Sequence, residues 1–138
     1  MMKFQDRYNS LFEVYGERND IAPSLLKAQV RAESGFNPMA RSQAGASGLA
    51  QFMPATFSEW STKLRIPAPN IYNPEDSIQC QAAYMRWLLD QFAGNLDRAL
   101  GAYNFGIGNE RLHKPWPVET INYVARIKGY LAEYAAAV

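Results

Sequence analysis

Residues 33–54, ESGFNPMARSQAGASGLAQFMP, join the end of a predicted helix to a long segment rich in glycine and small residues. Leu26, Val30 and Glu33 fall at positions i, i+4 and i+7, so they share one face of that helix. Gly35 and the Asn-Pro pair that follows it end the helix. The stretch therefore predicts a helical fold with one carboxyl group at a helix end, on the face that points toward the core.

Glu33 is the only acid at this junction, because residues 34–58 contain neither Asp nor Glu. Burial raises the pKa of a carboxyl group, and an acid held partly protonated near neutral pH can donate a proton to a departing oxygen. The alternative is a surface glutamate near a helix end, but the negative end of the helix dipole disfavours the negative charge of a carboxylate there. Glu33 is therefore a candidate general acid.

The composition indicates one domain with its own core. The chain has 138 residues, of which 48% are hydrophobic and 13% aromatic. A net charge of +1 gives no field that favours nucleic acid, and no apolar run is long enough to span a bilayer. Residues 1–7 lack the apolar core of a signal peptide, so we expect a virion-associated protein or an excised domain. Cys80 and His113 are each the only residue of their type, and no phosphate-binding loop is present, which predicts no disulfide, metal or cofactor.

Helical periodicity continues through most of the chain, and no segment alternates like a strand. We expect a first helix over residues 3–16 that ends at Gly16, a second helix capped by Asp20, and further helices that open near residues 54, 74, 96 and 118. The segments 36–53 and 104–117 are expected to be loops. The sequence thus predicts an all-α, mostly helical, single compact domain.

Several side chains in the loops are open to two interpretations. Gln51 fits a hydrogen bond to a sugar or to local backbone, and Met53 fits a binding cleft or a core gap. Tyr103 fits a hydrogen bond to Glu33 or a packing role. Trp116, between two prolines, is the tryptophan we expect to be exposed for stacking on a sugar ring.

Four short motifs, taken in order, resemble the lytic transglycosylases of the soluble Slt type, a lysozyme-like superfamily. Glu33-Ser34 resembles the family's catalytic Glu-Ser pair, and residues 48–54, GLAQFMP, resemble its Gly-Leu-Met-Gln-hydrophobic-Met-Pro motif. Residues 102–106, AYNFG, resemble its Ala-Tyr-Asn-Ala-Gly motif, and residues 119–124, ETINYV, its Glu-Thr-x-x-Tyr-Val motif. Together they imply a lysozyme-like transglycosylase fold with a substrate cleft.

The resemblance covers about residues 20–130 of a single catalytic domain over residues 1–138, and leaves the N-terminal support helix over 3–16 outside it. Three residues depart from the motifs without removing a proton-transfer group: Ala50, Phe52 and Phe105.

The resemblance also implies a reaction: cleavage of the β-1,4 bond between N-acetylmuramic acid and N-acetylglucosamine in peptidoglycan, with formation of 1,6-anhydro-muramoyl ends. Glu33 would act first as acid and then as base, in place of the usual pair of carboxylates. No cofactor and no metal are implied. The positions that match the family's substrate-binding residues are Ser42, Gln51, Met53, Tyr103, Asn104 and Tyr123.

Two other functions remain open. A hydrolytic lysozyme of the goose type would need a second acid to position water, for which Asp76, Asp90 and Asp97 are the candidates. A non-catalytic wall-binding module of a secretion or phage machine would need no acid at all. Under each reading we expect glycan strands of peptidoglycan as partner, in the periplasm or cell wall, together with a secretion, conjugation or virion assembly partner.

Overall fold

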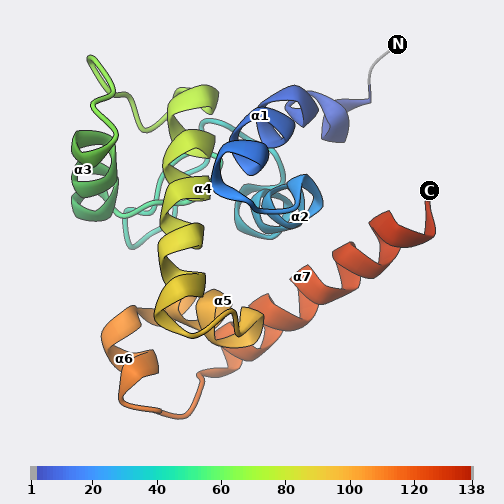
Figure 1. Cartoon of the computed structure of the whole chain (residues 1–138), viewed down its shortest axis with the longest axis vertical. Coiled ribbons are helices and arrows are strands. Elements are labelled where there is room, and N and C mark those ends of the chain that lie inside the picture. Colours follow the sequence, from blue (N-terminus) through green and yellow to red (C-terminus); the bar gives the residue numbers. More distant parts are fainter. Residues whose placement is uncertain (1–2, 138) are drawn as a thin grey trace. The chain divides into compact units, whose positions relative to one another are not determined.

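The computed structural model describes residues 3–137, and its regular structure is helical (Figure 1). In chain order the elements are η1 (Phe4–Asp6), α1 (Asn9–Asn19), α2 (Pro23–Ser34), α3 (Pro54–Lys63), α4 (Pro74–Gln91), α5 (Leu96–Phe105), α6 (Ile107–Arg111) and α7 (Val118–Ala136). Between residues 3 and 137 there is no β-strand, only isolated bridges that join Ser47 to Arg41 and to Phe52. The all-α prediction is confirmed.

The chain divides into two compact units. The first unit ends at Ala83 and the second begins at Tyr84, so α4 contributes residues to both. Each unit has its own set of buried side chains. The single catalytic domain and the substrate cleft expected from the sequence stay predictions.

The first unit is built around the packing of α1 on α2. Its interior holds side chains that are at most 1% exposed: Phe12, Leu26, Val30, Leu49 and Ile78. Each of these contributes on the order of 1.5–3 kcal/mol by leaving water. The inward face that the spacing of Leu26 and Val30 predicted is therefore present in α2.

The N-terminal segment differs from the helix predicted over residues 3–16. η1 is separate, and α1 continues through Gly16 to Asn19. Gly16 lies inside the helix because the chain turns back onto it: a Cβ there would lie 2.6 Å from the backbone oxygen of Ile21. Asp20 ends α1 in the left-handed conformation, with φ 53°, and does not cap α2.

Proline begins three of the helices in the first unit. Pro23, Pro54 and Pro74 are the first residues of α2, α3 and α4. Proline suits this position because the first turn of a helix has no acceptor for the missing N–H. The starts predicted near residues 54 and 74 are confirmed.

The second unit packs α5 against α6 and α7. Its fully buried side chains come from the end of α4, from α5 and from α7, and include Met85, Leu88, Leu100 and Ile127. The loop predicted over residues 104–117 is wrong in part, because α6 lies within it. Gly106, with φ 102°, separates α5 from α6.

Candidate active site

Glu33 lies half-buried in the last turn of α2, directly before the end of the helix. The hydroxyl of Ser34 donates a hydrogen bond to the Val30 carbonyl at 3.1 Å. Gly35 follows in the left-handed conformation, with φ 59°, and its N–H donates to the Arg31 carbonyl. This arrangement fixes the end of the helix, and with it the backbone of Glu33.

The segment after Glu33 is a loop tied to itself through the Ala40 carbonyl. That oxygen accepts from the Gly48 N–H at 2.9 Å and from the Gln51 side-chain amide nitrogen at 3.1 Å. The same amide nitrogen donates to the Gly48 carbonyl at 2.9 Å. Gln51 thus bonds local backbone through its nitrogen, whereas its side-chain oxygen accepts no hydrogen bond from residues 3–137.

Gly48 is required by its surroundings as well as by its backbone conformation. Its φ is 81°, and a Cβ there would lie 2.2 Å from the Ile71 carbonyl oxygen. Gly45 also has positive φ, 97°, but faces open space. Gln51, with φ 51°, adopts the left-handed conformation without being glycine, and such strain is typical of functional loops.

Ser42 lies within this loop, and Met53 is its last residue. The Ser42 hydroxyl accepts a hydrogen bond from the Ala46 N–H at 3.0 Å, so it stabilises the turn between them. Met53 is 45% exposed and directly precedes α3, so it is not a core residue. The first unit therefore carries Glu33, Ser42, Gln51 and Met53 on one continuous segment.

The other three predicted residues belong to the second unit. Tyr103 is half-buried and packs on Tyr84, with ring centroids 5.3 Å apart. The side-chain oxygen of Asn104 accepts from the Thr120 hydroxyl at 2.8 Å, which ties α5 to α7. Tyr123 is 1% exposed, so its ring offers almost no surface to a ligand. Asn104 and Tyr123 thus support the unit from within.

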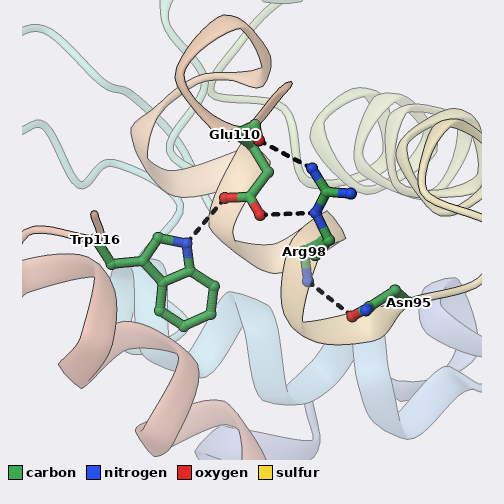
Figure 2. Close-up of polar contacts among 4 residues, drawn as sticks. All are labelled: Asn95, Arg98, Glu110 and Trp116. Carbon is green, nitrogen blue, oxygen red and sulfur yellow. Dashed lines mark hydrogen bonds and ion pairs between the residues drawn. The ribbon is translucent and has the colours of Figure 1, made fainter. Parts of the chain in front are cut away.

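Trp116 is not the exposed stacking residue that the sequence predicted. Figure 2 shows its indole N–H directed at the carboxylate of Glu110, to which it donates at 2.8 Å. Arg98 donates to the other Glu110 oxygen at 3.1 Å and to the Glu110 carbonyl at 2.9 Å, and Asn95 caps the helix that carries Arg98. The Trp116 ring also lies against Gly101. A buried carboxylate six residues away therefore holds the tryptophan.

The acids considered for a hydrolytic mechanism all have partners. Asp76 accepts from the Asn70 N–H at 3.0 Å, Asp90 pairs with Arg86 at 2.8 Å, and Asp97 pairs with Lys128 at 3.1 Å. Among residues 3–137 no group of three or more His, Cys, Asp or Glu side chains could hold a metal ion. No helix in the same part of the chain has the length and apolar character to cross a membrane.

Sequence comparison identifies relatives of this chain among bacterial and phage proteins. The chain is 36% identical over 113 residues to the soluble lytic murein transglycosylase of Salmonella typhimurium, covering 79% of this chain and 18% of that protein. It is 32% identical over 108 residues to a transglycosylase of Enterobacteria phage PRD1, covering 78% of this chain and 37% of the phage protein. The chain thus spans about a fifth and about a third of the length of these two curated relatives.

The structural comparison extends over nearly the whole chain. The fold matches an inactive glutamate-to-glutamine mutant of the lytic transglycosylase Slt from Pseudomonas aeruginosa with a TM-score of 0.87 at 30% identity. That match covers 97% of this chain and 25% of the Pseudomonas chain. The family described as the transglycosylase SLT domain matches residues 10–115. The chain therefore belongs to the transglycosylase SLT domain family.

Proposed function

We propose that this chain is a peptidoglycan lytic transglycosylase domain that cleaves the β-1,4 bond between N-acetylmuramic acid and N-acetylglucosamine. The observation that carries the proposal is the position of Glu33, half-buried in the last turn of α2 and followed by the strained loop. The name of the Salmonella relative supports murein as substrate. The inactive mutant of the Pseudomonas relative, in which glutamine replaces a glutamate, supports a glutamate as the essential group.

One carboxyl group is enough for this chemistry. Glu33 donates its proton to the glycosidic oxygen as the bond to the anomeric carbon breaks, while the substrate's N-acetyl group supports that carbon. The Glu33 carboxylate then takes the proton of the C6 hydroxyl, whose oxygen closes the 1,6-anhydro ring. Because the attack is intramolecular, its high effective concentration replaces a positioned water and a second acid.

The loop supplies the sugar contacts in this proposal. The side-chain oxygen of Gln51 accepts no hydrogen bond from residues 3–137, so it is available to an amide or hydroxyl of the glycan. Ser42 and Met53 are exposed on the same segment and extend that surface. In the second unit, Tyr103 is the half-buried position proposed for the glycan, with Asn104 and Tyr123 as supports of α5 and α7.

The proposed place of action is the peptidoglycan of the periplasm or cell wall, with glycan strands as the partner. Relatives from both a bacterium and a phage fit wall remodelling as well as a secretion, conjugation or virion setting.

Product analysis tests the proposal directly. Purified sacculi are digested with the 138-residue chain, and the released fragments are analysed by mass spectrometry. We expect 1,6-anhydro-muramoyl ends, which are lighter by one water than reducing ends. Reducing ends would show hydrolysis of the goose-lysozyme kind, and absence of any fragment would indicate a wall-binding module.

A further inference from the structure

A pair of glutamine side chains joins α2 to α4 inside the first unit. Gln29 and Gln81 are both 0% exposed. The side-chain nitrogen of Gln81 donates to the side-chain oxygen of Gln29 at 2.8 Å and to the Leu26 carbonyl at 3.2 Å. The side-chain oxygen of Gln81 is buried and accepts no hydrogen bond from any group of residues 3–137.

Packing does not explain this amide pair. A buried polar atom costs free energy unless it is hydrogen-bonded, and one of the Gln81 atoms is not. Two methionines are unbranched and of similar length, so they would fill the same space without polar atoms. The amides add a directional constraint, because a hydrogen bond between two helices is made only at one axial position of one helix on the other.

The two glutamines connect the two parts of the candidate site, which are the end of α2 with Glu33 and the loop with Gln51. Gln29 precedes Glu33 by four residues on α2, which places them one turn apart on the same side. Ser77 precedes Gln81 by four residues on α4, and its hydroxyl accepts from the Ala50 N–H at 3.2 Å, next to Gln51. One buried side of α4 therefore holds both the helix of Glu33 and the loop.

We propose that Gln29 and Gln81 are positioning residues, which set the place of the Glu33 carboxyl group relative to the loop that carries Gln51. The inference rests on the proposed function, since it assigns a purpose to the position of Glu33. A displacement on the order of 1 Å at a reacting group can cost a factor of about a hundred in rate. The amide pair prevents such a displacement.

The test compares the 138-residue chain with the double variant Gln29→Met, Gln81→Met on a soluble murein glycan. We expect a melting temperature at or above that of the unchanged chain. We also expect a kcat at least about tenfold lower, a KM within about twofold, and a shifted pH profile of kcat. The control is Ser61→Ala, which removes a different buried polar group, a hydroxyl that bonds only within α3, to the Ser58 carbonyl. The control should keep the kcat and pH profile of the unchanged chain.

A folded double variant with unchanged kcat and pH profile would overturn the inference, as would an equal loss in Ser61→Ala. If the double variant does not fold, Gln81→Met alone is measured in the same way, and an unchanged profile there has the same meaning. Glu33→Gln separates the two proposals. If Glu33→Gln stays active, both the catalytic role of Glu33 and the positioning role of the two glutamines are wrong. If Glu33→Gln is inactive and the double variant is fully active, only the positioning role is wrong.

Discussion

Two glutamates near helix ends, one in each unit, have very different surroundings. Glu110 in α6 is 5% exposed, and its two carboxylate oxygens are taken by Arg98 and Trp116 (Figure 2). Glu33 in α2 is only half-buried and is followed by a loop with left-handed backbone at Gly48 and Gln51. The more buried acid is held by two donors, whereas the acid proposed to react is the less buried one. A matched substitution at the two sites should separate activity from stability.

The largest effect is expected for Glu33→Gln. Glutamine keeps the shape of the side chain but has no proton to donate, so turnover of peptidoglycan should fall at least about a hundredfold. The melting temperature should not fall. Glu59→Gln, at an exposed position of α3, is the control and should keep full turnover. Equal turnover in the two variants would contradict the role of Glu33.

Glu110→Gln should have the opposite effect: it should lower the stability of the fold and leave turnover nearly unchanged. The amide NH2 must then face Arg98 or Trp116, both of which are donors, so a buried hydrogen bond is lost. Because the Arg98 side chain is 30% exposed, water screens part of the loss. We therefore expect the free energy of unfolding to decrease by about 2 kcal/mol. Thermal melting should show a decrease on the order of 5 °C. Turnover well below the melting temperature should stay near that of the unchanged chain; a stable but inactive variant would give Glu110 a catalytic role.

Two glycines sharpen the structural side of the comparison. A Cβ at Gly101 would lie 2.9 Å from the Glu110 carboxylate and from the Trp116 ring, so Gly101→Ala should cost about 1–3 kcal/mol. Gly108 lies in α6 with nothing within 4 Å of its Cβ position, so Gly108→Ala should gain up to about 1 kcal/mol. Urea unfolding measures both. If Gly101→Ala were the more stable of the two variants, the space between Gly101, Glu110 and Trp116 would be large enough for a methyl group.

The smallest effect concerns Cys80, the neighbour of Gln81 on α4. Burial raises the pKa of its thiol from 9.0 to about 12. Since the folded pKa lies above the unfolded one, the thiol's contribution to stability is fully present below pH 9 and is lost as the pH rises toward 12. At pH 8 the folded chain should resist an aromatic disulfide reagent that reacts readily with the chain in denaturant. Rapid reaction of the folded chain would show that the Cys80 thiol is accessible to solvent in the folded state, against its burial in α4.

Local signals in the sequence were sufficient for most helix boundaries. Pro54 and Pro74 begin helices, and Gly35 ends one, because each acts through its own backbone. Gly16 was misinterpreted as a helix end, since its missing side chain makes room for the backbone of Ile21 after the turn. That is a tertiary contact, and no local pattern reports it.

The roles of the candidate site residues stay predictions, and the sequence did not report the contacts around them. The motif around Glu33 indicated the acid. The partner of Trp116 was missed because Glu110 lies on α6, a short helix in a segment whose prolines and glycines predict a loop. The amide pair was missed altogether. Its signal was present at Gln29, a polar residue three positions after Leu26 on a helix face that the sequence required to be apolar. The partner on α4 follows only from the packed structure.

The close approach of the Ile71 carbonyl to Gly48 has a consequence for reading variation among homologues. A deep mutational scan should find this glycine intolerant of every replacement, even in a selection that scores expression alone. Invariance of Gly48, the first residue of the motif over residues 48–54, would then reflect the lack of space beside the backbone of Ile71. Evidence for glycan contact should instead be sought at Gln51, where the scan under wall-lysis selection and the scan under expression selection ought to disagree.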